Sequence, residues 1–518
     1  MPHVVSEDFF GGDGGAGPSA DDDVGSGVPL LRTRNKGHPA SAHPEGGARK
    51  IASWPRASVI ICANLMGAGV LALPTVMRHL GWIPGLAIVA VLGLGSVYSG
   101  ALLTRVWILA EEKAHGRPAA KYGDLGRAAY GALGHDVVNF VCYFYISCVT
   151  VVFHLTTAES LQTIFHATAG DWCQWQFSAI VAFLVWPFAQ VRSLQNVSSL
   201  AIVGALTILG TVAIVVGRLA AMGALEDARW HLVDISSRDA PQKVGAVMTV
   251  VFSYCGQAIF TELITAMERP RDFPKAVWSS SLTMMLTYAV IAAAGYAALG
   301  SLAVAPVTSA LPNDVWVLMA NVLLFVHVLV AYVIEVNILS KGLINLLARP
   351  GGGRRESAAG EDAGNSGLGV RGSIPAGATA LPKAGPGTPH AIAAAAIARE
   401  RRSRRVWMAS TSFLIVGAFL LSNVCSFFVE LLSFAGATGG IATTYIFPCV
   451  FLLRLDKRMP RWERFVCRAV VGFAVLLAAL GIVNACLDIW RQWEQIGPPF
   501  ACMSCEYKRA HKLTPGVC

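Results

Sequence analysis

The 518-residue sequence is 54% hydrophobic and only 14% charged, with a mean hydropathy of +0.54. Soluble globular domains carry roughly 25% charged residues, so this composition excludes a soluble globular protein and predicts an all-α polytopic protein of the lipid bilayer. The net charge of +9 does not indicate a nucleic-acid partner, because the basic residues lie in short segments between apolar runs rather than on one folded face.

The chain opens with a tail and continues as a series of apolar runs. Residues 1–52 are rich in Gly, Ser, Ala, Pro and Asp, which predicts a disordered tail. From Ser58 onward, runs bounded by charges each approach the ~20 residues that a helix needs to cross a bilayer. A short interfacial helix is expected over 124–130, before the third span. We expect about eleven spans: 57–79, 81–108, 136–166, 174–191, 195–219, 244–267, 275–299, 314–346, 406–428, 434–454 and 465–490.

The first span is interrupted at its centre by residues 64–69, which include Asn64, Gly67 and Gly69. Each glycine weakens a helix interior by roughly 1 kcal/mol relative to alanine, and hydrocarbon cannot satisfy the asparagine amide. Broken backbone at membrane depth persists only where it is buried in protein or lines a wet cavity. The stretch is therefore interpreted as half of a binding site, with close helix approach as the alternative.

The sixth span contains a second interruption at residues 252–258, where polar side chains and Gly256 fall at mid-membrane. If spans one to five and six to ten are inverted repeats, the two breaks occupy corresponding positions. Paired interruptions of this kind indicate a transport site near the midplane.

Lys and Arg are concentrated in alternate loops, which places the N-terminus in the cytosol. Residues 53–348 hold spans one to eight, and residues 406–490 hold spans nine to eleven. Between them, residues 349–405 lack Phe, Trp and Tyr, which predicts a disordered, basic cytosolic insert. Its end, residues 391–405, could form an arginine-rich helix against anionic lipid or merely flank the ninth span.

The C-terminal tail, residues 491–518, contains cysteines on the outside of this topology, where disulfides with Cys173 are permitted. Zinc binding by the tail is the weaker alternative, because the ligand spacing fits no strong pattern. We found no nucleotide-binding loop, nucleophile constellation or well-spaced metal cluster, so neither an enzyme nor a cofactor is expected. The zinc alternative would use Cys502, Cys505, His511 and Cys518.

Several segments carry a family resemblance. Residues 64–74, followed by Gly-Trp at 81–82, resemble the first-span signature of the amino acid/auxin permease family. Residues 252–262 and 268–276 are similar to that family's sixth span and following loop, and residues 122–125 match its second loop. The resemblance implies eleven spans, a five-plus-five inverted repeat, and discontinuous first and sixth spans.

An amino acid is a good physical match for such a pair of breaks. Its carboxylate can accept hydrogen bonds from freed N–H groups at the positive end of a half-helix, and exposed carbonyls can accept from its ammonium group. Gly256 is expected to leave room for the substrate side chain, with Gln257 at the border. Tyr143 or Tyr145 could set selectivity, although packing is the favoured role for both. The backbone donors are assigned to Gly67, Ala68, Gly69 and Val70, and the acceptors lie around Ala63, Asn64, Ser253 and Tyr254.

Titratable residues lie near this path. Glu262 follows the sixth-span break, and the eighth span carries His327 and Glu335. Ionisable residues inside membrane helices are functional candidates, although His327 could be a core histidine and Glu335 could reach the cytosolic end. Residues 311–339 contain no Ser or Thr, which argues against a sodium site built from hydroxyls on this span.

The sequence therefore predicts a secondary active transporter that moves neutral amino acids by alternating access. Proton coupling is favoured, with Glu262 as the first candidate and His327 as the second. The alternatives are a sodium-coupled carrier and a transporter-like sensor that signals through its tails. The expected location is the plasma membrane or a vacuolar or lysosomal membrane.

Overall fold

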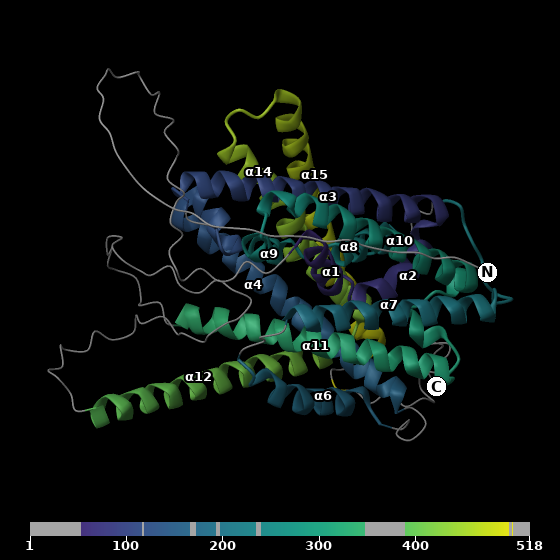
Figure 1. Cartoon of the computed structure of the whole chain (residues 1–518). Helices are drawn as coiled ribbons and strands as arrows, with labels where there is room; N and C mark the ends of the chain where they lie inside the picture. The colour runs from purple at the N-terminus through teal and green to yellow at the C-terminus, as the bar shows by residue number, and fades with distance from the viewer. Residues whose placement is uncertain are drawn as a thin grey trace, which may run out of the picture. The chain divides into compact units, whose positions relative to one another are not determined.

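A computed structural model describes residues 53–116, 119–165, 172–192, 197–234, 240–347, 389–496 and 500. These residues all belong to one unit, residues 48–518. Every regular element among them is a helix (Figure 1). Helices satisfy their own backbone hydrogen bonds, as a segment surrounded by hydrocarbon must.

Most of the apolar runs form long helices. Those whose membrane span is a single helix are α3 (Trp82–Lys113), α4 (Tyr122–Ile164), α6 (Gln174–Ala189), α7 (Val197–Met222), α10 (Phe273–Leu299), α11 (Val315–Leu347), α12 (Pro389–Val424) and α15 (Arg461–Ile496).

Three spans are assembled from shorter pieces. The first consists of α1 (Trp54–Leu65), η1 (Ala68–Ala72) and α2 (Leu73–Leu80), and the sixth of α8 (Ala240–Ser253), η2 (Gln257–Ile259) and α9 (Phe260–Ala266). The tenth consists of α13 (Phe428–Ala435), η6 (Gly436–Gly440), η7 (Ala442–Ile446) and α14 (Phe447–Leu455). Short connecting helices complete the described chain: η3 (Pro270–Asp272), η4 (Gly300–Leu302) and η5 (Val307–Ala310).

By length and composition, the described chain contains up to ten of the eleven or so expected spans. Nine helical segments of the described chain are long and apolar enough to cross a membrane, and the first span, bent by 55° between α1 and α2, is a tenth. α6 lies where the fourth span is expected, but with 16 residues it is shorter than these segments. The chain is therefore an all-helical membrane protein with interrupted first and sixth spans.

Two boundaries differ from the prediction, and one feature of α4 agrees with it. α12 begins at Pro389, so the end of the segment expected to lack structure is helical, as the alternative for residues 391–405 allowed. The tenth span begins at Phe428 rather than at residue 434, and its central residues form wider π-helical turns. In α4, Gly131 adopts φ 72° and separates the first turns from the membrane span, which confirms the short helix over 124–130.

The interrupted spans lie in the interior of the bundle. α10 packs against both α1 and α2, and η1 contacts α8, α10 and α4. Around them, α11 packs along α7 and α4, while α12 lies beside α6 and α11 (Figure 1). Large apolar side chains such as Phe183, Phe413 and Phe473 are exposed on the outer helices, as expected for surfaces that face lipid.

Candidate functional site

The first interrupted span loses its helical hydrogen bonds over a short, buried stretch. The Met66 N–H closes the last turn of α1, and helical bonding resumes at Val70, whose N–H donates to the Gly67 carbonyl at 3.2 Å. None of the described hydrogen bonds uses the N–H groups of Gly67, Ala68 or Gly69. Three adjacent backbone donors are therefore free to bind a ligand.

The sixth span breaks in the same manner. α8 ends at Ser253, and the N–H groups of Tyr254 and Cys255 each bond to the carbonyl three residues earlier, which tightens the final turn. The Gly256 N–H then leaves the backbone pattern and donates to Gln257 Oε1 at 2.9 Å. The Gly256 N–H therefore bonds to a side chain of the same break rather than to the backbone.

The two breaks touch through their glycines. A Cβ atom added to Gly69 would lie 2.6 Å from Ser253 Oγ and 3.1 Å from Phe252 Cδ1. A Cβ atom added to Gly256 would lie 2.2 Å from Leu65 Cδ1. Only glycine permits this approach. The space that Gly256 was expected to offer to a substrate is filled by Leu65 in this conformation.

Tyr288, on α10, joins the two breaks and was not predicted. Its hydroxyl donates to the Ser253 carbonyl at 2.8 Å and lies 3.4 Å from the Leu65 carbonyl. Its ring lies 5.1 Å from that of Tyr254. The available signal was a tyrosine in the middle of an apolar span, where its hydroxyl must find a partner in the protein.

Gln257 is completely buried and all of its described partners are protein groups. Its Oε1 accepts from Thr444 Oγ1 at 2.7 Å as well as from the Gly256 N–H, and its Nε2 donates to Ser96 Oγ at 3.0 Å. Ser96 lies on α3 and Thr444 on η7. In this conformation Gln257 connects the sixth-span break to two other spans rather than bordering a pocket.

The other candidates near the breaks lie in different surroundings. The Asn64 side chain is exposed and donates to the carbonyl one turn earlier in its own helix, at 2.8 Å. Tyr143 packs against Gly342, where an added Cβ would lie 2.5 Å from its ring. Tyr145 instead reaches the break, with its hydroxyl 3.5 Å from the Cys255 carbonyl. Of the two tyrosines, only Tyr145 is placed to influence this region.

His327 faces the first-span break from α11. The side chain is buried, and its Nδ1 lies 2.9 Å from the Gly204 carbonyl on α7. The ring also interacts with the backbone of Met66, at the start of the unwound stretch. Carbonyl oxygens only accept hydrogen bonds, and a neutral imidazole has one N–H, so separate bonds from both ring nitrogens require the protonated form.

Glu262 and Glu335 form a separate acidic site. Glu262, on α9, is exposed and interacts electrostatically with Lys121 and Lys341. Glu335, on α11, interacts with Glu262, and its Oε2 atom is buried without a hydrogen-bond partner among the described residues. Neither carboxylate has a described contact with the unwound backbone of the breaks.

The described residues contain no group of three or more His, Cys, Asp or Glu side chains that could hold a metal ion. Cys173 is disulfide-bonded. The tail residues considered for zinc, Cys502, Cys505, His511 and Cys518, lie outside the described residues.

Comparison with known protein families identifies the chain. The family of transmembrane amino acid transporter proteins matches residues 50–487. The chain belongs to this family. Members of the transmembrane amino acid transporter family are membrane transporters rather than enzymes. Both interrupted spans of this chain lie inside the matched region.

Individual relatives of this transporter family are distant. The chain is 26% identical to amino acid transporter AVT1C of Arabidopsis thaliana over 48% of this chain and 44% of the relative. It is 24% identical to the N amino acid transport system protein of Neurospora crassa over 48% of this chain and 52% of that protein. The matched segments span about half of the length of these relatives.

The crystal structure of MhsT in complex with L-phenylalanine shares the fold of this family member. The two superpose with a TM-score of 0.53 at 10% sequence identity, over 85% of this chain and all of MhsT. At this identity the likeness establishes a shared fold and nothing about the ligand.

Proposed function

We propose that the protein is a secondary active transporter that carries amino acids across a membrane by alternating access. The observation that carries the proposal is the set of three free N–H groups at Gly67, Ala68 and Gly69, where two interrupted spans meet. Backbone donors at the start of a half-helix favour an anionic group such as a carboxylate. The names of the relatives, which are amino acid transporters, support the same substrate class.

The remaining contacts support positions for the ammonium group and the side chain of the substrate. The carbonyls of Ser253 and Leu65 accept from Tyr288, and an ammonium group could take over those acceptors when the breaks separate. A Cβ on Gly67 would meet the Phe153 ring at 3.5 Å, so the space beside the free donors is bounded by an apolar side chain. An apolar wall favours neutral amino acids over charged ones.

Alternating access would then open and close the contacts between the breaks. The pairs Gly69 with Ser253 and Gly256 with Leu65 hold the segments together in this conformation, and substrate entry requires that they move apart. Rocking of one repeat against the other would produce this motion around a fixed site.

Protons are proposed as the coupling ion, with His327 as the site of protonation. The ring interacts with the backbone of Gly204 and of Met66, and the protonated form can donate to two carbonyls. Glu262, the first candidate from the sequence, becomes the second, because its described electrostatic partners, Lys121 and Lys341, lie away from the unwound backbone. The absence of Ser and Thr from residues 311–339 continues to disfavour sodium.

Purified protein in liposomes provides the test. Radiolabelled neutral amino acids should accumulate against their gradient when the external side is acidic, and a protonophore should abolish the accumulation. Replacement of sodium by choline should have no effect. Binding without accumulation would favour the sensor alternative, and sodium-dependent uptake at constant pH would contradict proton coupling.

The orientation and location belong to the same proposal. The basic loops support an orientation with the N-terminus and residues 349–405 in the cytosol, in a plasma, vacuolar or lysosomal membrane. An epitope added before residue 52 should be accessible to antibody only after the membrane is permeabilised. Accessibility in intact cells or vesicles of known sidedness would reverse the orientation.

A further inference from the structure

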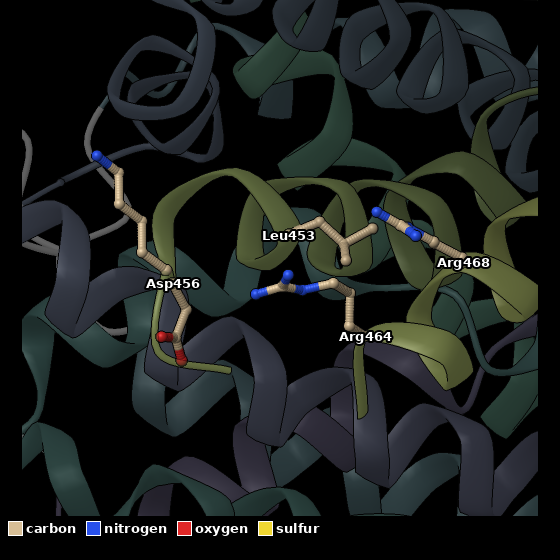
Figure 2. Close-up of a pocket in the computed structure, with 5 residues that line it drawn as sticks. Leu453, Asp456, Arg464 and Arg468 are labelled. Atoms are coloured by element: carbon tan, nitrogen blue, oxygen red, sulfur yellow. The ribbon is translucent and has the colours of Figure 1, made fainter. Parts of the chain in front are cut away.

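A basic groove lies at the junction of α14 and α15, far along the chain from both breaks. It encloses about 490 Å³ and is lined by Leu453, Asp456, Lys457, Arg464 and Arg468. Figure 2 shows the side chains of Arg464 and Arg468 extending from one helix toward Leu453. These arginines are four residues apart on α15, so they project from the same face of the helix on successive turns.

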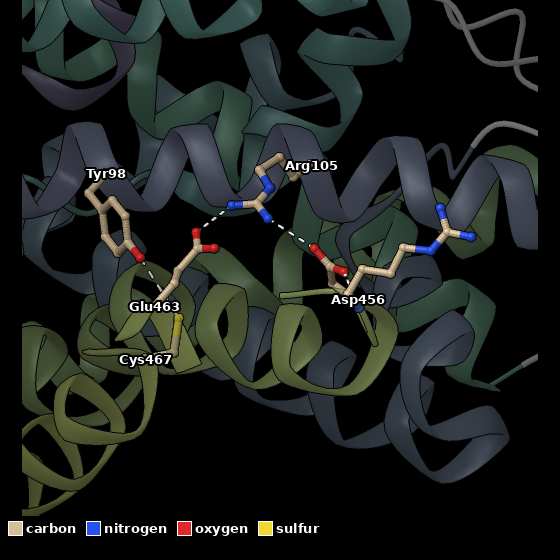
Figure 3. Close-up of polar contacts among 6 residues, drawn as sticks. Tyr98, Arg105, Asp456, Glu463 and Cys467 are labelled. Carbon is tan, nitrogen blue, oxygen red and sulfur yellow. Dashed lines mark hydrogen bonds and ion pairs between the residues drawn. The ribbon is translucent and has the colours of Figure 1, made fainter. Parts of the chain in front are cut away.

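The two acidic side chains of this region, Asp456 and Glu463, already have ion-pair partners. Asp456 Oδ2 accepts from Arg105 at 2.9 Å, and Asp456 Oδ1 accepts from the Arg458 N–H at 2.9 Å. Arg105 also pairs with Glu463, so that one guanidinium bridges both acids (Figure 3). Neither acid has a described ion pair with Lys457, Arg464 or Arg468.

The three cations of the groove therefore lack counter-ions. Among the described residues, no ion pair involves Lys457, Arg464 or Arg468. Two like charges on successive turns of a helix repel one another unless an anion lies between them. The N-terminal end of α15, which starts at Arg461, adds the positive end of a helix dipole.

The position of the groove relates it to the membrane surface. Trp462 and Phe465, on the same turns of α15, are 66% and 72% exposed. Exposed tryptophan beside charged residues is typical of the boundary between hydrocarbon and headgroups. The groove thus opens at the depth where lipid headgroups lie, next to an apolar surface that faces acyl chains.

We propose that this groove is a binding site for phosphate groups, supplied either by the headgroup of a phosphorylated inositol lipid or by a free phosphate monoester. Two adjacent guanidinium groups can each bind phosphate oxygens in a bidentate manner, and Lys457 adds a third charge. Basic pockets between membrane helices suit such headgroups. In the proposed orientation the groove faces the cytosolic leaflet.

The test measures binding directly and does not depend on transport. Purified full-length protein is titrated, by thermophoresis, with short-chain phosphatidylinositol 4,5-bisphosphate and separately with inositol 1,4,5-trisphosphate. Arg464→Gln/Arg468→Gln should weaken binding of the short-chain lipid at least about tenfold, because several charge-assisted hydrogen bonds are lost. The matched control is Arg458→Gln/Arg461→Gln, which removes the same charge from the same segment without altering the groove lining.

The outcomes separate the sources of the phosphate. Binding of both probes, lost only in the groove variant, would support a site for phosphate itself. Binding of the short-chain lipid alone, lost only in the groove variant, would support a lipid headgroup. Equal weakening of binding in the control variant would show that the probes are attracted only by the overall positive charge, and would overturn the proposal. Failure of the unmodified protein to bind either probe would also overturn it.

A second variant keeps the test decisive if the glutamine variant misfolds. Arg464→Lys/Arg468→Lys retains both charges but removes the bidentate geometry, so it should weaken binding of the phosphorylated headgroup while the melting temperature stays unchanged. Unchanged affinity in this variant would show that the groove does not recognise phosphate through its arginines.

Discussion

The contact of Gly69 with the sixth span supports a sharp prediction for Gly69→Ala. The added Cβ would lie 2.6 Å from Ser253 Oγ and 3.1 Å from Phe252 Cδ1, both tighter than van der Waals contact. Overpacking of this kind typically costs about 1–3 kcal/mol. At 1.4 kcal/mol per factor of ten, the closed arrangement of the breaks would lose about fivefold to 140-fold in population.

Uptake by reconstituted protein measures this loss. Gly69→Ala should slow accumulation at least about fivefold while the variant still inserts and elutes as a single species on size exclusion. The matched control is Gly417→Ala on α12, where an added Cβ meets nothing within 4 Å. The larger Gly69→Val should abolish uptake. Normal uptake by Gly69→Ala would refute the close contact between the breaks.

A rescue experiment locates the clash. Ser253→Ala removes the oxygen that lies nearest to the added Cβ, and its hydroxyl otherwise bonds only within its own helix, to Thr249. The double variant Gly69→Ala/Ser253→Ala should therefore recover part of the lost uptake. An additive loss in the double variant would show that the two residues do not meet during transport.

Three further variants test the surrounding contacts. Tyr288→Phe leaves the Ser253 carbonyl without its described donor, which should cost about 1 kcal/mol and appear as a lower melting temperature and slower uptake. Gln257→Ala removes three buried hydrogen bonds, so it should reduce stability by about 2–5 kcal/mol in thermal unfolding while the order of preference across an amino acid panel stays the same. His327→Gln keeps hydrogen bonding but cannot be protonated, so exchange of internal for external substrate should persist while acid-driven accumulation disappears. Glu262→Gln should retain acid-driven accumulation. The opposite pattern in the two variants would return the coupling role to Glu262.

The sequence predicts the fold well because membrane burial leaves a strong signal. Long apolar runs, loop charges and the two glycine-containing interruptions all follow from the need to satisfy the backbone in hydrocarbon. The tenth span begins six residues before the expected residue 434, and these residues include Glu430, which accepts a hydrogen bond from Gln492 on the neighbouring helix α15. A buried pairing of this kind cannot be read from local composition.

The details of the site depend on contacts between distant parts of the chain. The backbone donors at Gly67 to Gly69 were predicted because the glycines that interrupt the helix lie in the same short stretch of sequence as the donors. The partners of Gln257, which come from α3 and η7, were not predicted. A glutamine in an apolar span looks identical in the sequence whether its amide faces a ligand or another helix. Tyr288 was missed for the same reason: its role depends on two carbonyls that lie in other spans.

The proposed coupling rests on one peptide group. The His327 ring interacts with the backbone of Met66, whose carbonyl belongs to the same planar unit as the free N–H of Gly67. In a trans peptide these two groups point in opposite directions, so a proton on the histidine and a carboxylate at the donors can bind from opposite sides. Hydrogen bonds in such a chain polarise one another. Protonation would therefore strengthen the Gly67 donor, and substrate binding would raise the affinity of the histidine for its proton by the same factor.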